Sequence, residues 1–195
     1  MQIWRKNLRY LLSFLLFISS YSLLYPKTIM QIELSGSTEG VIQIELMENI
    51  APNHVQQIIK LVNKKKYDGV AFHRVIEGFM AQTGDVQFGN VLTGYSFGMV
   101  GRGGSDFDNI KAEFSNIPFD RGIVGMARAQ DPDSANSQFF IMFQDGHFLN
   151  GNYTVFGKVL SGMDIVDKIK KGDPNKNGMI QKDPDFMNKV IILEN

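Results

Sequence analysis

The chain lacks cysteine altogether over its 195 residues. Disulfide bonds, thiol catalysis and zinc–thiolate sites are therefore excluded. Histidine is scarce: His54, His73 and His147 are the only three, and no two of them form an HExxH pair. We therefore expect no metal site. Because an exported protein can do without disulfides, the lack of cysteine leaves the compartment open.

Net charge is absent as well, since 20 Lys and Arg residues balance 20 Asp and Glu residues. Nucleic-acid binding requires a basic surface, so this balance gives no support for such a role. The phosphate-loop pattern GxxxxGKS/T is missing, and the glycine-rich run at 101–104 does not follow a clear strand. A hydrolase or a metalloenzyme is disfavoured by the lack of cysteine and of clustered histidines.

The first 26 residues differ in composition from the rest of the chain. Arg5, Lys6 and Arg9 make the start basic, residues 1–26 contain no acid, and an apolar run follows at 11–18. A basic end, a short apolar stretch and then smaller residues are typical of a secretory signal peptide. We therefore expect a periplasmic or otherwise exported protein from which this segment is cleaved.

An uncleaved membrane anchor is the alternative for the same segment. Residues 10–25 approach the ~17–25 residues that a membrane-spanning helix needs. The expected organisation is a signal peptide or anchor over 1–26 and one folded domain over 27–195, with membrane contact only through the anchor. The domain carries 17 basic and 20 acidic residues, a net charge of −3 that again argues against nucleic acid as a partner.

Hydrophobic periodicity in the domain predicts many short strands and only two helices. Strands are predicted over 29–34, 41–46, 122–127, 138–143, 155–160 and 189–193. The aromatic segment 67–84 is also strand-like, 85–112 is typical of a long loop, and helical spacing predicts helices from 52 to the lysine run 64–66 and over 163–169. This pattern favours a closed antiparallel β-barrel, which leaves no exposed edge strand.

Several sequence blocks, in the expected order, resemble the signature of the cyclophilins. The longest is FHRVIEGFMAQTGD at 72–85, followed by SQFFI at 137–141, FLNG at 148–151 and VFGKV at 155–159. The resemblance covers about residues 29–194, which is nearly all of the domain. A match of several ordered blocks is far more specific than the triplet FHR alone.

The resemblance implies a mainly β fold, namely a closed eight-stranded antiparallel β-barrel capped by two α-helices. It implies peptidyl-prolyl cis/trans isomerase (rotamase) activity, with no metal and no cofactor. The implied partners are proline-containing peptides and unfolded or nascent proteins, and we expect a monomer. The departures from the familiar eukaryotic pattern favour the bacterial, exported branch of the family.

The family's active-site positions are carried over by motif. The expected catalytic residues are Arg74, which matches the catalytic arginine, and Gln82, in the same block, which is expected to orient Arg74 or to bond the substrate backbone. The substrate-binding residues implied by the resemblance are Phe79, Met80, Gly101, Ala127, Arg128, Gln138, Phe140, Phe148, Leu149 and Tyr153. Phe148 replaces the tryptophan of many members and Tyr153 a histidine. We therefore expect catalysis without strong cyclosporin affinity.

The chemistry of proline isomerisation explains why an arginine suits this position. The reaction rotates an X–Pro amide past a barrier of about 18–20 kcal/mol, and at the twisted transition state the prolyl nitrogen regains a lone pair. A fixed donor aimed at that nitrogen stabilises the twisted state more than either planar state. Arg74 stays charged and offers several donors in one rigid plane. Neighbouring apolar residues would hold the proline ring.

Two functions remain open on the sequence alone. The first is an exported isomerase that accelerates the folding of other exported proteins. The second is a proline-peptide binding module or holdase chaperone that keeps the groove but has weak turnover. Arg74 discriminates between them, because a pure binder has no need of a catalytic arginine. His73, its neighbour on a strand, is predicted to point to the opposite face and to play a structural part. His54, in the first turn of the predicted helix, is expected to be exposed, and His147 is expected to lie in a loop without a partner.

Overall fold

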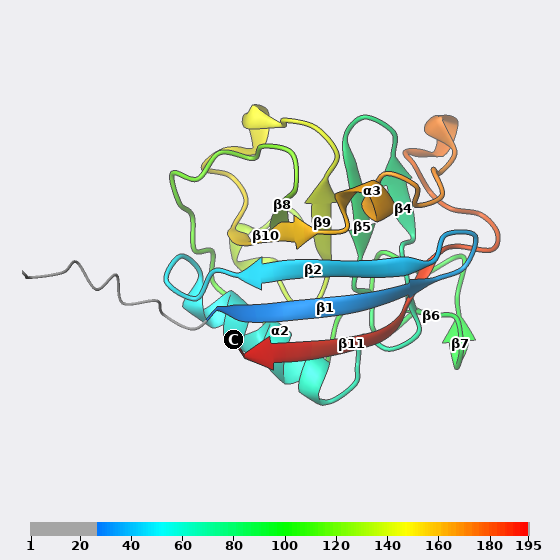
Figure 1. The fold of residues 1–195 in the computed structure, drawn as a ribbon, viewed down its shortest axis with the longest axis horizontal. Coiled ribbons are helices and arrows are strands. Elements are labelled where there is room, and N and C mark those ends of the chain that lie inside the picture. Colours follow the sequence, from blue (N-terminus) through cyan, green and yellow to red (C-terminus); the bar gives the residue numbers. More distant parts are fainter. Residues whose placement is uncertain (1–26, 195) are drawn as a thin grey trace, which may run out of the picture.

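The computed structural model describes residues 27–194, and these form one large antiparallel β-sheet with two helices. The eleven strands within this range are β1 (Thr28–Ser35), β2 (Gly40–Leu46), β3 (Val70–Ala71), β4 (Arg74–Ile76), β5 (Met80–Thr83), β6 (Gly89–Asn90), β7 (Gly94–Tyr95), β8 (Ile123–Met126), β9 (Phe139–Met142), β10 (Val155–Ser161) and β11 (Phe186–Glu194). Figure 1 shows β2, β1 and β11 side by side, with β4, β5 and β9 running roughly crosswise to them.

The sheet curls into a half-barrel, with the strand order β4-β5-β9-β8-β10-β2-β1-β11-β3-β6-β7. The predicted mainly β, antiparallel, two-helix architecture is confirmed. The strand count rises from the expected eight to eleven because the segment 67–84 divides into three strands and the predicted loop 85–112 contains β6 and β7. Within residues 27–194 the two outermost strands, β4 and β7, are not paired with each other.

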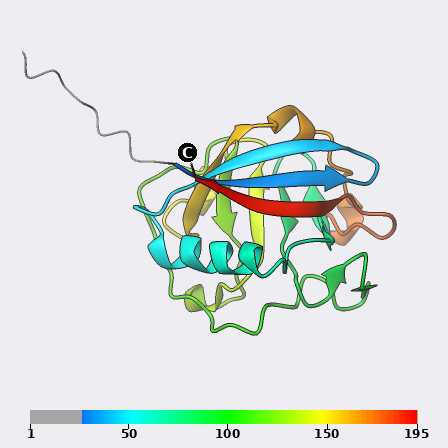
Figure 2. The same cartoon turned by 60° about the horizontal axis from the view of Figure 1, so that its bottom comes forward.

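The two helices lie at opposite ends of the curled sheet (Figure 2). Helix α2 (Pro52–Asn63) packs beside β11, and the short helix α3 (Met163–Val166) packs beside β2. Three 3-10 turns complete the elements, η1 (Pro132–Ser134), η2 (His147–Leu149) and η3 (Pro174–Lys176). Both predicted helices are confirmed, although α3 ends three residues before the predicted Ile169.

Helix α2 begins in an unusual way, because its first residues are capped by a side chain from a distant loop. Ala51 precedes the helix and cannot supply a capping oxygen. The carboxylate of Glu113 instead accepts hydrogen bonds from the backbone N–H groups of Asn53 and His54, over 3.2 and 3.1 Å. The same carboxylate lies 2.6 Å from Nδ1 of His54. His54 was expected to be exposed; that prediction is wrong, since the histidine is buried beneath Glu113.

Successive side chains of β9 point to opposite faces of the sheet and belong to two separate apolar clusters. Phe139 and Ile141 point into the main core inside the curled sheet, which also buries the apolar faces of α2, β1 and β2. Phe140 and Met142 point the other way, into a smaller cluster with Leu149 and residues of neighbouring loops. The second cluster forms the base on which the candidate active site is built.

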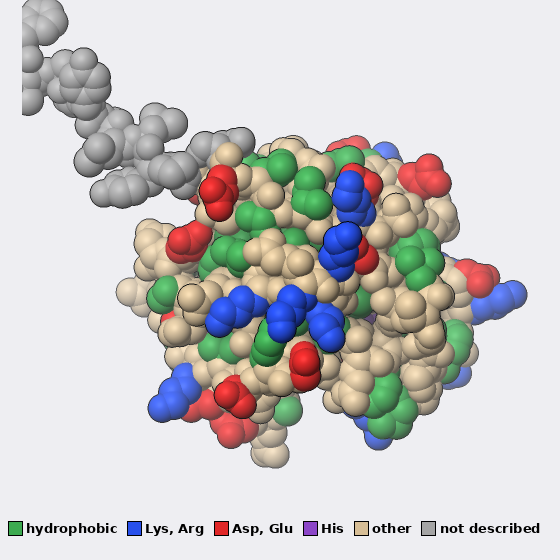
Figure 3. All heavy atoms as spheres, turned by 90° about the horizontal axis from the view of Figure 1, so that it is seen from below, with side chains coloured by type: hydrophobic (Ala, Val, Ile, Leu, Met, Phe, Trp, Pro, Cys, Tyr) green, Lys and Arg blue, Asp and Glu red, His purple; other side chains and the backbone are tan. Residues whose placement is uncertain are grey.

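Surface charge is mixed on the side of the molecule drawn in Figure 3. Basic, acidic and apolar side chains alternate there, apart from one small group of Lys and Arg side chains. A surface of this kind lacks the single-sign field that steers a polyanion. The predicted signal peptide or anchor, residues 1–26, lies outside the described residues. Among residues 27–194, no helix has both the length and the apolar character needed to cross a membrane.

Candidate active site

Arg74 lies on β4, directly opposite Gln82 on β5. Cross-strand pairing places both side chains on one face of the sheet, where Nη1 of Arg74 donates to Oε1 of Gln82 over 3.0 Å. Gln82 then donates to Oε1 of Gln138 over 3.0 Å, and Gln138 donates to the carbonyl oxygen of Gly103 over 2.8 Å. This series of hydrogen bonds fixes the orientation of both glutamines and one side of the guanidinium.

The other side of the guanidinium is held by Asn177, a residue that the sequence analysis did not single out. Nε of Arg74 donates to the backbone oxygen of Asn177, and Nη2 donates to its Oδ1, both over 3.0 Å. Asn177 follows η3 and adopts a left-handed conformation with φ 54°, which asparagine tolerates better than most residues. The dipeptide Asn177-Gly178 is a turn signal in the sequence.

A cavity of about 290 Å3 opens beside Arg74. Its lining residues are Arg74, Phe79, Met80, Gln82, Ala127, Arg128, Phe140, Phe148, Leu149 and Tyr153. Phe140 and Leu149 are buried at its base, whereas Phe148 stands at the rim, 71% exposed, with its ring 5.4 Å from that of Phe79. The cavity therefore combines an apolar floor with two charged donors, Arg74 and Arg128, an arrangement typical of a ligand site.

A second cavity of about 400 Å3 adjoins the first. The two share Gln82, Ala127 and Arg128, and the second is lined further by residues 101–103 and by polar residues before β9. Ten of the twelve site residues expected from the sequence line the first cavity, and the remaining two, Gly101 and Gln138, line the second. The structure thus brings the whole predicted set into one continuous groove.

Burial affects the charge of Arg74 only slightly. Desolvation lowers the pKa of its guanidinium from the usual value, and Tyr153 across the cavity acts in the opposite direction. Since an arginine guanidinium is not deprotonated in proteins, Arg74 remains a charged donor throughout the physiological pH range. Its charge is presented in a partly desolvated site, where a hydrogen bond to it is stronger than in water.

His73 lies behind the groove and takes no part in its lining. Its side chain is only 3% exposed, and burial lowers its pKa to about 4, so the imidazole is neutral at pH 7. Neither ring nitrogen has a hydrogen-bond partner among residues 27–194. A buried neutral ring on the face opposite Arg74 agrees with the structural role expected for it.

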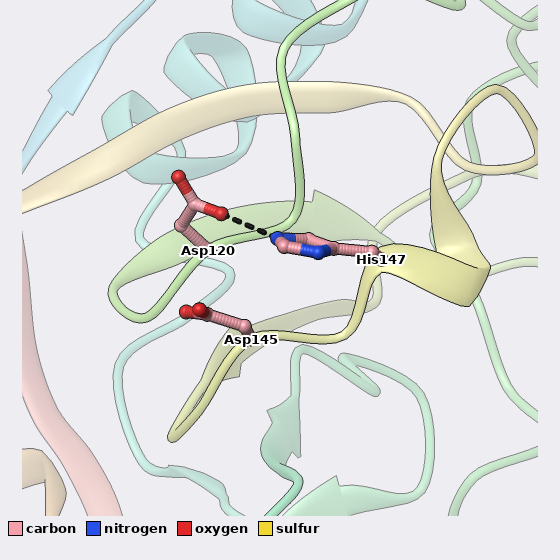
Figure 4. A group of neighbouring side chains, drawn as sticks. All are labelled: Asp120, Asp145 and His147. Carbon is pink, nitrogen blue, oxygen red and sulfur yellow. Dashed lines mark hydrogen bonds and ion pairs between the residues drawn. The ribbon is translucent and has the colours of Figure 1, made fainter.

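One group of metal-ligand side chains occurs among the described residues, away from the groove lining (Figure 4). Asp120 and His147 face each other at 2.7 Å, and Asp145 lies beside them. All three side chains are exposed, and Asp145 accepts a hydrogen bond from the backbone of Arg121. His147 was thought to have no partner, but the structure gives it Asp120. The pair holds η2, which carries Phe148 and Leu149.

Residues 94–98 read GYSFG and match the GxSxG pattern of serine hydrolases. A hydrolase nucleophile sits on a turn between a strand and a helix. Ser96 instead follows the two-residue strand β7 in a loop, and within residues 27–194 its side chain has no histidine partner. The pattern therefore carries no hydrolytic site here.

Comparison with known proteins agrees with this geometry. Residues 29–193 match the family model described as cyclophilin type peptidyl-prolyl cis-trans isomerase/CLD. A probable peptidyl-prolyl cis-trans isomerase of Brucella suis is 61% identical over 154 residues, covering 79% of this chain and 78% of that protein. Peptidyl-prolyl cis-trans isomerase B of Escherichia coli is 36% identical over 167 residues, covering 81% and 93% respectively.

Solved structures show the same fold. The cyclophilin AquaCyp293 of Hirschia baltica superposes with a TM-score of 0.67 at 26% identity, covering 85% of this chain and 76% of that one. A cyclophilin-type isomerase of Cryptosporidium parvum, crystallised in the presence of the dipeptide Ala-Pro, gives a TM-score of 0.70 at 26% identity, covering 86% and 99%.

The curled antiparallel sheet, the groove and these matches together define a cyclophilin-type isomerase, and the chain belongs to that family. Its activity is that of a peptidyl-prolyl cis-trans isomerase, which accelerates rotation about X–Pro peptide bonds.

Proposed function

We propose that this isomerase accelerates the folding of exported proteins, with Arg74 as its catalytic side chain and the cavity beside it as the proline site. The geometry of Arg74 is the observation that supports the catalytic part. Of its five N–H donors, three are held by Gln82 and Asn177, and Nη1 also lies 3.9 Å from the sulfur of Met80. At least one donor remains for a substrate, on a guanidinium whose position is already fixed.

The proline ring fits the apolar side of the cavity. Phe140 and Leu149 supply its floor, and Met80 adapts its shape to the ring. With the ring held there, the acyl part of the peptide turns about the C–N bond while Arg74 donates to the prolyl nitrogen. The Ala-Pro dipeptide used with the Cryptosporidium parvum isomerase supports a prolyl ligand in a groove of this fold.

The electrostatic role proposed for Arg74 requires no proton transfer. Rotation makes and breaks no covalent bond, so the enzyme has only to stabilise the twisted amide relative to the planar one. A preorganised donor in a partly desolvated site contributes about 3–4 kcal/mol in comparable oxyanion sites. Gln82 acts as a positioning residue because its contact is with Arg74 and not with the reacting bond.

Export rests on the composition of residues 1–26, with their basic start and apolar stretch. The partners of the proposed function are accordingly unfolded or nascent exported proteins with slow X–Pro bonds, bound by a monomeric enzyme. Uncatalysed isomerisation takes tens to hundreds of seconds, which is slow enough to limit folding.

A refolding assay separates this function from a holdase that merely binds proline segments. A secreted protein whose refolding is limited by proline isomerisation is mixed with the enzyme at one-tenth of its concentration. The proposal predicts faster refolding with the wild type and an uncatalysed rate with Arg74→Ala, whose fold is verified by circular dichroism. Suppression of aggregation only at equal concentrations, with the same effect from Arg74→Ala, would instead show a holdase.

A further inference from the structure

We propose that the second cavity binds an acidic side chain of the substrate, so that the enzyme selects proline peptides with Asp or Glu near the proline. This inference rests on the proposed function, since it takes the first cavity as the proline site. The residues lining the second cavity include two arginines, Arg102 and Arg128, and no acid. A concave site lined by charge of one sign attracts the opposite charge and concentrates its field.

Arg128 stands at the junction of the two cavities and lines both. Nε and Nη2 donate to the carbonyl oxygen of Asn152 over 3.3 and 2.9 Å, and Nη1 donates to the carbonyl oxygens of Ala129 and Gln130 over 3.0 and 3.2 Å. The guanidinium also lies 4.5 Å from the centre of the Tyr153 ring. These acceptors are all neutral, so they fix the position of the charge without neutralising it.

One donor of Arg128 is left after these contacts, because four of its five N–H groups are used. Arg102 also lines the second cavity and is exposed, next to Gly101, whose φ of 91° forms the turn there. Its guanidinium has no ion-pair partner among residues 27–194. A carboxylate in the cavity would thus meet one cation fixed by hydrogen bonds, Arg128, and one without an ion-pair partner among residues 27–194, Arg102.

The neutral polar groups of the cavity are already engaged within the protein. The hydroxyl of Ser134 donates to Asp131, that of Ser137 to Gly84, and the oxygen of Asn136 accepts from Ser105. A neutral polar side chain of the substrate therefore finds few free partners. The arginines are the groups that still offer donors, and a charge-assisted bond to a carboxylate is the strongest bond they can make.

The nearest acids do not reverse this balance. Asp85 lies beneath the 101–103 turn, fully buried, and its carboxylate accepts backbone N–H bonds from Gly101 and Gly103, as well as from Gln87 and Phe88. Its charge is therefore spread over four donors on the inner side of the turn. Asp133, beyond Ser134, accepts from the backbone of Ala112 and does not line the cavity. The cavity lining therefore carries two cations and no acid, and the hydrogen bonds of the buried Asp85 carboxylate are already satisfied.

The distance between the two cavities limits which substrate residue can place its side chain in the second cavity while the proline occupies the first. They share three lining residues, and an extended peptide advances about 3.3 Å per residue. The acidic side chain should therefore lie within three residues of the proline.

The test is a set of peptides with one proline and with Glu, Gln or Lys at each of the three positions on either side of it. The measured quantity is kcat/KM for isomerisation at low and high salt. We expect Glu to exceed Gln by about 5- to 10-fold at one position, Lys to fall below Gln there, and added salt to reduce the difference. Equal kcat/KM values for Glu and Gln at all six positions would overturn the proposal.

Matched variants assign the selectivity to the two arginines. Arg102→Gln and Arg128→Gln should each bring the Glu-to-Gln ratio towards one, whereas Arg102→Lys should retain most of it. Lys189→Gln, which removes an exposed charge from β11, is the control and should leave the ratio unchanged. If the double variant Arg102→Gln/Arg128→Gln keeps the wild-type ratio, the site assignment is wrong.

Failure of this inference is distinguishable from failure of the proposed function. Arg74→Ala should lower kcat/KM for the Glu and the Gln peptides alike. A wild type that turns over all peptides equally, with Arg74→Ala inactive, refutes only the charge selectivity. An active Arg74→Ala that still prefers Glu refutes the catalytic assignment and leaves the acidic subsite standing.

Discussion

Arg74 depends on a neighbour that lies 103 positions away in the sequence. Asn177→Gly keeps the left-handed backbone and its carbonyl but removes the Oδ1 that binds Nη2. We expect kcat/KM for a proline tetrapeptide to fall about 5- to 30-fold, mainly in kcat, because a hydrogen bond to a charged group contributes about 1–2 kcal/mol to positioning. Asn175→Ala, in the same loop, is the control, because only its backbone N–H is used. An equal loss of kcat/KM in both variants would contradict a specific role for Asn177.

His73 makes stability depend on pH. Its pKa is about 4 in the folded protein because burial disfavours the charged ring, against 6.5 in the unfolded chain. The contribution of the neutral His73 to the free energy of unfolding is therefore complete above pH 6.5. It is lost as the pH falls towards 4, because the unfolded state then binds the proton more readily than the folded state.

The measurement is urea unfolding at pH 7 and at pH 4.5 for the wild type and for His73→Gln. Between pH 7 and pH 4.5, we expect the free energy of unfolding to fall by about 2 to 3 kcal/mol more in the wild type than in the variant. His54, whose pKa burial also lowers, remains in both proteins and does not enter the difference. The same loss in both proteins would contradict a buried neutral His73.

At the scale of elements, the start of α2 is held by one carboxylate. Burial alone would raise the pKa of Glu113, but hydrogen bonds from His54 and Asn53 outweigh burial and the pKa is lowered. The cap is therefore charged and present at neutral pH, and it is lost as the pH falls through the lowered pKa.

Glu113→Ala should lower the free energy of unfolding by about 1–3 kcal/mol, because it removes two caps and leaves His54 without its partner. Hydrogen exchange should quicken in the first turn of α2, while kcat/KM stays the same. Glu39→Ala, an exposed acid in the β1–β2 turn, is the control. Unchanged exchange in α2 would show that the helix does not need this cap.

The elements that local patterns predicted are those with strong periodicity of their own. The β1–β2 hairpin, β8, β9, β10 and β11 lie within two or three residues of their expected bounds, because alternation specifies which face each residue occupies. Strands β6 and β7 were missed, since two-residue strands in a glycine-rich loop leave no periodic signal. The burial of His54 was missed because Glu113, its partner, comes from a loop 59 residues away.

The groove was foreseen because most of its residues come from two contiguous motifs. The block 72–85 supplies adjacent strands, and 137–151 supplies the floor and rim, so local sequence carries most of the site. The roles of Asn177 and Arg102 were not predicted, because they depend on how the loops that carry these residues pack against the sheet. Such long-range contacts have no signature in a single sequence.

At the scale of the whole molecule, the composition of residues 1–26 predicts that the protein works outside the cytoplasm. If residues 1–26 are a signal peptide, the protein recovered from cells expressing the full chain should begin after this segment and be found outside the cytoplasm. N-terminal sequencing of the purified protein together with cell fractionation checks this. Intact Met1 on membrane-associated protein would show the anchor instead, and intact Met1 on cytoplasmic protein would contradict export.

The central claim is that a fixed guanidinium at Arg74 stabilises the twisted amide. The most direct measurement is kcat/KM for cis/trans exchange of a proline tetrapeptide by the wild type and by Arg74→Ala, with circular dichroism spectra of both. We predict identical spectra and a 10²- to 10³-fold lower kcat/KM for the variant, as expected for loss of about 3–4 kcal/mol of transition-state stabilisation. Equal kcat/KM values in two correctly folded proteins would contradict the claim.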